Sequence, residues 1–145
     1  MEISDAKIQK AFNNEENKYL LGFTTETMQK MIKEIIEELD LSRETNIEIR
    51  RSLRNYKYVD EVSDLKYGTY LRWISLKTDT DTDTLKLNKG AIFCETKISD
   101  NGISLLCKSV YGNRLFQLML DENIIFQKLT NEEIILLTAL DFLAK

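Results

Sequence analysis

The chain has 145 residues and a formal net charge of −4, with 43% hydrophobic and 30% charged residues. This composition is typical of a water-soluble globular chain and gives no overall attraction to nucleic acid or to anionic membranes. The sequence contains no His and no Pro, and the missing His excludes His-based triads, His-ligated metals and His general bases.

The N-terminal part, residues 1–55, has the pattern of helices. Apolar residues recur at intervals of three and four, most clearly between Met28 and Leu39. Ser4, Thr24 and Ser42 are the N-cap candidates. We therefore predict helices over 3–13, 24–41 and 42–55, and leave 19–23 as a short strand or an inward-packing loop. The apolar face of the third helix is narrow, which is typical of a peripheral helix.

From Tyr56 the hydrophobic period changes to two, which indicates strands. Asp100-Asn101-Gly102 and Tyr111-Gly112-Asn113 are turn sequences, because Gly and Asn tolerate positive φ. Successive strands at spacings near ten residues predict a meander. We expect an α+β fold whose residues 56–129 form a small antiparallel, five- to six-stranded, barrel-like sheet. The predicted strands are 56–59, 69–76, 85–87 with 90–97, 103–110, 114–120 and 124–128.

The last part of the predicted single domain (residues 1–145) is an apolar helix over 130–145. Thr130 and Glu133 have the spacing of a capping box, which marks its start. Apolar residues cover more than half of its circumference, so this helix needs broad cover. Two arrangements stay open: the helix closes the barrel, or it is shared with another subunit. The candidate self-association residues are Leu136, Leu137, Leu140, Phe142 and Leu143.

Cys94 and Cys107 both lie in apolar runs. Free Cys is among the most buried residue types, so we predict two buried thiols on adjacent strands, with a disulfide as the alternative if the strands pair at that point. An enzyme that uses one of these thiols is a third functional class, and it predicts rapid alkylation at neutral pH.

The run Thr78–Thr84 contains Asp79, Asp81 and Asp83 at a spacing of two, which resembles the start of a calcium loop. Thr84 stands where that loop requires Gly, and Gly90 stands where it requires Glu. We therefore predict a solvated loop, with binding of a divalent ion as the less favoured alternative.

A basic segment spans residues 42–57, where five Lys and Arg residues oppose two Glu residues. Tyr56 and Tyr58 follow at once, and Arg beside an exposed aromatic ring suits phosphate contact and base stacking. The alternative is a solvated face whose charges pair within the chain. The candidate partner-binding residues are Arg50, Arg51, Arg54, Lys57, Tyr58, Tyr70 and Arg72.

Three segments carry a resemblance: Tyr56-Lys57-Tyr58-Val59, Leu65-Lys66-Tyr67-Gly68-Thr69-Tyr70-Leu71-Arg72-Trp73-Ile74, and Leu87-Asn88-Lys89-Gly90-Ala91-Ile92-Phe93. Together they resemble a small β module in uncharacterised proteins of large nucleocytoplasmic DNA viruses, with Ala91 in place of a second Gly. The resemblance implies a viral source and a non-enzymatic, virion-associated role, and it assigns no site residues. By the strand period, Tyr70 and Arg72 share one face and Leu71 and Trp73 the other, where Trp73 anchors the core.

The leading prediction is a non-enzymatic protein-interaction or structural module. The alternative is a nucleic-acid-binding accessory protein that uses the Arg and Tyr residues named above. We expect a protein partner or a second copy, with nucleic acid as the alternative, and neither a membrane nor a small-molecule substrate. We predict no catalytic, cofactor-binding or metal-ligating residue. The polar N-terminus lacks the pattern of a signal peptide, so the expected location is intracellular, in host cytoplasm or virion.

Overall fold

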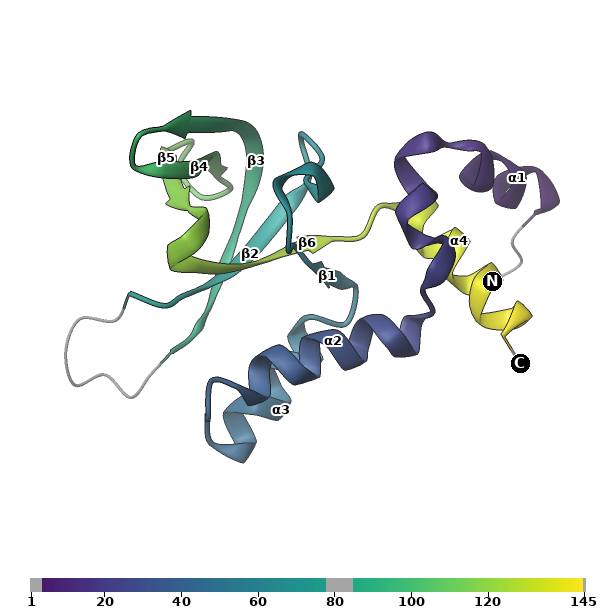
Figure 1. Cartoon of the computed structure of the whole chain (residues 1–145), viewed down its shortest axis with the longest axis horizontal. Helices are drawn as coiled ribbons and strands as arrows, with labels where there is room; N and C mark the ends of the chain where they lie inside the picture. Colours follow the sequence, from purple (N-terminus) through teal and green to yellow (C-terminus); the bar gives the residue numbers. More distant parts are fainter. Residues whose placement is uncertain (1–3, 78–84, 145) are drawn as a thin grey trace. The chain divides into compact units, whose positions relative to one another are not determined.

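The computed structural model describes residues 4–77 and 85–144 (Figure 1). It confirms the predicted α+β class, since helices accompany a six-stranded antiparallel sheet. The chain divides into two compact units. The helical unit consists of Met1–Asp40 and Leu129–Lys145, and the sheet unit is Leu41–Lys128. Each unit is described by itself.

The helical unit begins each of its α-helices with a side-chain cap. Ser4 Oγ accepts from the N–H of Lys7 at 3.3 Å, and Thr24 Oγ1 accepts from the N–H of Thr27 at 3.2 Å. Thr130 forms the predicted capping box with Glu133. These caps satisfy backbone donors that a helix leaves unpaired at its start. The helices are α1 (Asp5–Asn13), α2 (Thr25–Glu37) and α4 (Asn131–Leu143), with the 3-10 helix η1 (Glu15–Gly22) between α1 and α2.

The helix η1 replaces the strand or loop expected at residues 19–23. Asn14 starts it, because its side-chain oxygen accepts from the N–H of Glu16 at 3.0 Å. The Asn17 side chain is buried and donates to the carbonyl of Ala11 at 3.0 Å, which ties η1 to α1. The turn carries Leu20 into the core of the unit. That core consists of the buried residues Ala11, Leu20, Met28, Leu129, Leu136 and Leu137.

The sheet unit starts with α3 (Arg43–Ser52), which the Ser42 side chain caps as predicted. Six strands follow, in the order β1-β6-β2-β3-β4-β5 across the sheet. The strands β2 to β5 form the predicted meander, and β6 lies on the other side of β2. The strands are β1 (Tyr56–Tyr58), β2 (Tyr70–Ser75), β3 (Leu87–Ser99), β4 (Gly102–Ser109), β5 (Leu115–Met119) and β6 (Asn123–Lys128).

The sheet is curved but not closed, which corrects the expectation of a barrel. Among the described residues, β1 and β5 each pair with one neighbour only. The curvature has two sources. A single 3-10 turn, η3 (Leu120–Glu122), joins the edge strand β5 to β6 near the other edge, so the sheet must bend to bring them together. In addition, β3 carries an extra residue at 89–90 and another at Cys94, and such bulges bend a strand (Figure 1).

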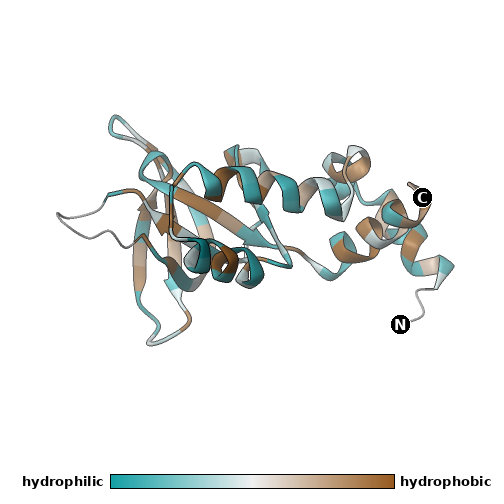
Figure 2. Cartoon of the chain, turned by 90° about the horizontal axis from the view of Figure 1, so that it is seen from below, coloured by the Kyte–Doolittle hydropathy of each residue, from teal (hydrophilic) through white to brown (hydrophobic). Residues whose placement is uncertain are grey.

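The two faces of the sheet agree with the predicted alternation. Leu71 and its cross-strand partner Ala91 lie in the main core of the unit, as does Ile125, which pairs with Trp73. Trp73 packs against this core. Hydrophobic stretches run along the strands in Figure 2. Tyr70 and Arg72 belong to the opposite face by the strand period. The role of Trp73 as a core anchor is therefore confirmed, although its side chain is only partly buried.

Candidate ligand-binding pocket

One pocket of about 440 Å³ opens at an end of the sheet in the sheet unit. Antiparallel order brings four strand ends together there: the end of β2, the start of β3, the end of β4 and the start of β5. Leu87, Asn88, Gly90 and Ser109 contribute to the wall. The other lining residues are three aromatic and two basic side chains, which we call the aromatic–lysine pocket: Trp73, Lys86, Lys89, Tyr111 and Phe116.

The bulge in β3 shapes one wall of this pocket. Trp73 pairs with Asn88 across the ladder, and the Asn88 side-chain amide donates to the Trp73 carbonyl at 3.2 Å. A Cβ at Gly90 would lie 2.1 Å from the Tyr70 ring, so this position needs Gly for the ring to cover it. The N–H of Gly90 also donates to the Tyr70 hydroxyl at 3.1 Å. These contacts hold Lys89 and its neighbours at the rim of the pocket.

The opposite wall depends on the turn between β4 and β5. Gly112 and Asn113 adopt positive φ, of 95° and 51°, as the turn sequence predicts. The Ser109 hydroxyl donates to the Tyr111 carbonyl at 2.9 Å and accepts from the Tyr111 N–H at 3.2 Å. Tyr111 is thereby held with 71% of its surface exposed, and the Lys89 ammonium lies 6.0 Å from its ring centroid.

Aromatic contact continues into the floor of the pocket. The Trp73 and Phe116 rings have centroids 5.5 Å apart and an interplanar angle of 42°. Both rings pack against the core on one side and line the pocket on the other. Their positions are therefore fixed by the fold before any ligand arrives, which lowers the ordering cost of binding.

The charged residues among the described lining of the pocket are both lysines, so the described lining contains no carboxylate. The sheet unit as a whole has 14 Lys and Arg against 12 Asp and Glu, a net charge of +2. The helical unit has 6 against 12, a net charge of −6. The net negative charge of the chain thus belongs to the helical unit.

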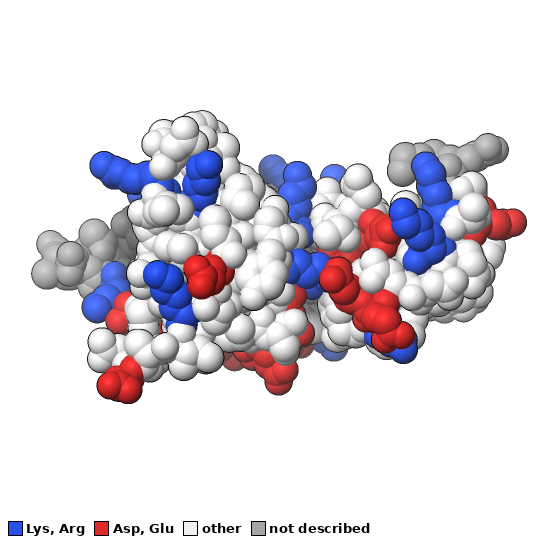
Figure 3. Space-filling model, turned by 90° about the horizontal axis from the view of Figure 1, so that it is seen from above, with Lys and Arg blue, Asp and Glu red and all other residues white. Residues whose placement is uncertain are grey.

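The predicted Arg and Tyr set does not form one exposed patch. Arg51 and Arg54 are exposed, whereas Tyr58, Tyr70 and Arg72 are half-buried, as is Arg50. Arg50 Nε donates to Asn46 Oδ1 at 2.7 Å, and Arg72 Nε donates to the Asn88 carbonyl at 3.2 Å. On the face drawn in Figure 3, the Lys and Arg side chains stand as separate groups among uncharged and acidic residues.

Lys57 is 2% exposed, so it cannot supply a surface contact as the sequence analysis expected. It pairs with Gln127 of β6, which pairs in turn with the core residue Leu71 of β2, so all three share the inner face of the sheet. Burial, followed by the charge of Lys66, lowers the pKa of Lys57 to about 7, against a smaller opposing effect of Asp64.

Gln127 organises the segment over this end of the sheet. Its side-chain oxygen accepts from the N–H of Lys66 at 2.8 Å and from the Thr69 hydroxyl at 2.7 Å. Its side-chain amide donates to the Asp64 carbonyl at 3.1 Å. The buried amide is therefore well satisfied and joins residues 64–69 to β6.

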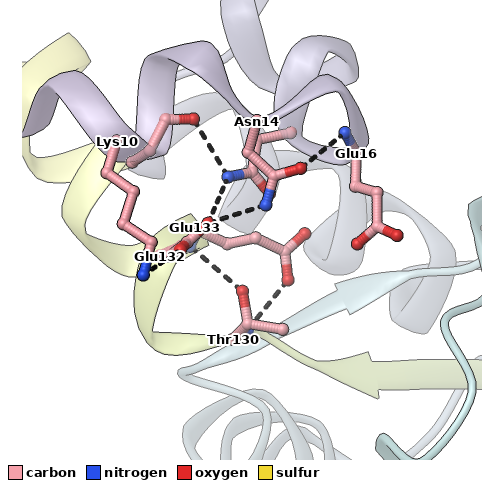
Figure 4. Close-up of polar contacts among 8 residues, drawn as sticks. Lys10, Asn14, Glu16, Thr130, Glu132 and Glu133 are labelled. Atoms are coloured by element: carbon pink, nitrogen blue, oxygen red, sulfur yellow. Dashed lines mark hydrogen bonds and ion pairs between the residues drawn. The ribbon is translucent and has the colours of Figure 1, made fainter. Parts of the chain in front are cut away.

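The helical unit buries a carboxylate at the start of α4, shown in Figure 4. Glu133 is 0% exposed. Its carboxylate accepts hydrogen bonds from the N–H of Thr130, at 2.8 Å, and from the Tyr19 hydroxyl. Burial is the main reason that the pKa of Glu133 rises to about 7. The Thr130 N–H lowers this pKa and Glu16 raises it, both by less.

The neighbouring carboxylate of Glu132 also has a structural role. It accepts from the side-chain amides of Asn14 at 2.8 Å and Asn17 at 3.2 Å, and Lys10 lies 3.8 Å away (Figure 4). The paired carboxylates at the start of α4 thus fasten α1 and η1 to this helix.

The proposed self-association residues separate into two groups. Leu136 and Leu137 are buried in the core of the helical unit, and the half-buried Leu140 packs against that core. Phe142 and Leu143, at the end of α4, are exposed. Of the predicted set, these two therefore remain the accessible apolar candidates.

Both cysteines are free thiols, so the alternative of a disulfide is not realised. Cys107 is buried, and burial raises its pKa to about 12, with a smaller contribution from Cys94. Cys94 is exposed, contrary to the prediction, because it is the extra residue of the second bulge in β3. The bulge turns its side chain away from the core face.

Two further observations concern metals and membranes. Within residues 4–77 and 85–144, no group of three or more Cys, Asp and Glu side chains is placed to hold a metal ion. The Asp and Thr run Thr78–Thr84 lies outside the described residues, so its suggested divalent site stays a prediction. In the part of the chain that the structure describes, no helix has the length and apolarity required to cross a bilayer.

Sequence reasoning named Trp73 but missed the lysines and the other two rings of the pocket. The predicted strand topology could have indicated these lining residues. In a meander, the end of one strand, the start of the next and the following turn meet at one end of the sheet. Residues 86–89, Tyr111 and Phe116 occupy those positions in the predicted strands. Comparison of the chain with protein-family models, curated proteins and solved structures finds no match.

Proposed function

We propose that the chain is a non-enzymatic interaction module whose sheet unit binds a negatively charged partner through the aromatic–lysine pocket. The observation that carries this proposal is the lining itself: three aromatic side chains and two lysines, with no carboxylate among the described lining residues. Preformed concave sites with aromatic walls and a few polar groups are the usual form of ligand pockets.

The groups in the protein that could do chemistry support a binding role. The hydroxyl of Ser109, at the pocket wall, is engaged with the backbone of Tyr111 and so builds the turn. The described side chains with shifted pKa values lie outside the pocket lining. Lys57 and Cys107 face the sheet core, Tyr56 is buried at the start of β1, and Glu133 caps α4. Perturbed pKa values often mark catalytic sites, and here they accompany structural burial instead.

A fluorescence titration tests the proposal, because Trp73 is the single Trp of the chain and lines the pocket. We would titrate the full chain with two anionic probes, a thymidine oligomer of about 12 nucleotides and an Asp-rich peptide of similar length. At least one probe should change Trp73 emission saturably. The double variant Lys86→Ala/Lys89→Ala should weaken that response about tenfold or more.

The matched control is Lys97→Ala/Lys128→Ala, which removes two exposed lysines of the same unit outside the pocket. It changes the net charge equally and should alter the affinity by about twofold or less. If neither probe changes Trp73 emission, or if both double variants weaken binding equally, the pocket is not the binding site and the proposal fails.

Other aspects of the predicted function stay predictions. The predictions of a viral source and of virion association depend on the sequence resemblance alone. The predicted intracellular location depends on the N-terminal sequence alone. The proposal for the pocket uses neither of these. Self-association through α4 is also untested. Sedimentation of a Phe142→Ser/Leu143→Ser variant would detect it, since an assembly held by these exposed residues should become monomeric.

A further inference from the structure

We infer that the partner of the aromatic–lysine pocket is single-stranded nucleic acid, with a base stacked against the aromatic wall and phosphates on Lys86 and Lys89. This inference rests on the proposed function and specifies the chemistry of the partner. It assigns to the pocket a role that the sequence suggested for the Arg and Tyr residues around 50–72.

The lysines decide the sign of the ligand. Three aromatic rings alone would suit a cation, which is attracted to the ring faces. Here the Lys89 ammonium already lies 6.0 Å from the Tyr111 ring centroid, and Lys86 adds a second positive charge to the lining. With no carboxylate among the described lining residues, the charged groups of the lining repel a cationic ligand and attract an anionic one. The site therefore selects an anion.

The rings decide what else the ligand must carry. Trp73 and Phe116 present ring surface in a pocket of about 440 Å³, and Tyr111 stands 71% exposed at its rim. A carboxylate side chain would pair with a lysine but leave the apolar surface of these rings exposed to solvent. A nucleotide combines a flat ring with a phosphate, so it contacts both kinds of group at once.

The half-buried rings of Trp73 and Phe116 favour a single strand. In a duplex both faces of a base are stacked on neighbouring bases, so no face is available to Trp73 or Phe116. In a single strand a base can leave its neighbours and enter the pocket. Lys86 and Lys89 are three residues apart on extended chain, about 10 Å between their Cα atoms, which favours charges that repeat along a polymer.

The charge distribution of the chain agrees with this assignment. The sheet unit carries a net charge of +2, whereas the helical unit carries −6. Attraction to a polyanion is therefore local to the sheet unit and modest. If both lysines contact phosphate, the logarithm of the binding constant should fall with the logarithm of the salt concentration with a slope of about −1.4.

The experiment measures Trp73 emission and probe anisotropy for the full chain. The probes are the thymidine oligomer, its duplex with adenosine oligomer, an abasic sugar–phosphate oligomer of equal length, and the Asp-rich peptide. The thymidine oligomer should bind about tenfold or more tightly than each other probe. Tyr111→Ala should weaken this binding about tenfold, and Lys86→Ala/Lys89→Ala should remove most of the salt dependence.

Tyr67→Ala is the matched aromatic control. Tyr67 lies in the same unit, is 71% exposed like Tyr111, and stacks on Phe93 outside the pocket lining. This variant should bind the thymidine oligomer within about twofold of the parent chain. Equal weakening by Tyr67→Ala and Tyr111→Ala would overturn the assignment of the base to this pocket.

The remaining outcomes separate the two proposals. If the Asp-rich peptide changes Trp73 emission and the oligonucleotides do not, the inference fails while the proposed function stands with a protein partner. If the duplex or the abasic oligomer binds as tightly as the thymidine oligomer, stacking contributes nothing and the inference fails. If no probe acts on Trp73, both proposals fail.

Discussion

Glu133 in the helical unit and Lys57 in the sheet unit are both removed from solvent, and burial shifts their pKa values in opposite directions. Burial disfavours the charged form of each, so the pKa of the carboxyl rises to about 7 and that of the ammonium falls to about 7. Burial therefore makes folding take up a proton at one residue and release a proton at the other. On folding, Glu133 takes up a proton near pH 6, whereas Lys57 releases one near pH 9.

This difference predicts opposite responses of the two units to pH. The pKa of Glu133 lies above its ordinary value of 4.5, so its contribution is complete below pH 4.5 and is lost as the pH rises through 7. The pKa of Lys57 lies below its ordinary value of 10.5, so the unfolded state binds more protons between pH 7 and 10.5. Lys57 should therefore add stability to the sheet unit over that interval. Above pH 9 the raised pKa of Cys107 acts in the opposite direction, because the folded state keeps a proton that the unfolded thiol loses.

The largest expected effect concerns Lys57. Between pH 7 and 10.5 its titration should raise the free energy of unfolding of the sheet unit by on the order of 4 kcal/mol. Lys57→Met, which keeps the length of the side chain without the charge, should remove this rise. Urea unfolding followed by Trp73 emission at a series of pH values measures it. The exposed Lys128→Met is the control and should keep the parent slope; equal slopes for all three proteins would refute the effect.

The next effect concerns Glu133 and has the opposite sign. Between pH 4.5 and 7 the helical unit should lose on the order of 3 kcal/mol of stability. Glu133→Gln should abolish this loss, since the amide oxygen can still accept from the N–H of Thr130. Urea unfolding followed by far-UV circular dichroism gives the measurement. Glu26→Gln, an exposed position in the first turn of α2, should leave the loss unchanged.

Helix starts were the most predictable part of the fold, because local chemistry sets them, whereas α2 and α3 end at Glu37 and Ser52, before the predicted ends at 41 and 55. Ser4, Thr24, Ser42 and Thr130 are caps in the sequence and in the structure. The strand period likewise placed Leu71 and Trp73 on the core face. The prediction left a break at residues 88–89 between two parts of the third predicted strand. The structure has a single strand, β3, in which a bulge shifts the register.

The site was less predictable, because burial depends on tertiary cover. Lys57 sits between two tyrosines in a basic segment and so resembled a surface residue. Its place on the inner face follows only from pairing with Gln127 and from the segment that Gln127 binds. In the same way, Lys86 and Tyr111 are far apart in sequence, and only the meander brings them to one pocket.

A smaller effect on stability is expected from the N-cap of α4, and it can be measured separately from the effect of the Glu133 charge. Thr130→Ala removes the hydroxyl that accepts from the N–H of Glu133 at 3.1 Å and should cost about 1 kcal/mol. The Thr130 N–H still reaches the Glu133 carboxylate, so the pH dependence between 4.5 and 7 should persist. Thermal melts at both pH values test this. Thr130→Ser keeps the hydroxyl and should have the stability of the parent chain. If Thr130→Ala loses the pH dependence, the contributions of the cap and of the Glu133 charge to stability are not independent.

The last prediction concerns the thiols, where we expect a difference in reactivity between two neighbouring strands and the smallest effect on stability. Cys94 is exposed at the bulge of β3, whereas burial raises the pKa of Cys107 on β4 to about 12. Only the thiolate reacts, so iodoacetamide at neutral pH should label Cys94 alone in the folded protein and both thiols in urea. Intact mass gives the number of adducts, and Cys94→Ser identifies the labelled thiol. Rapid labelling of Cys107 in the folded protein would mean that the core beside Phe93 opens readily. It would also revive the hypothesis of a thiol enzyme that uses Cys107, which the buried, protonated sulfur argues against.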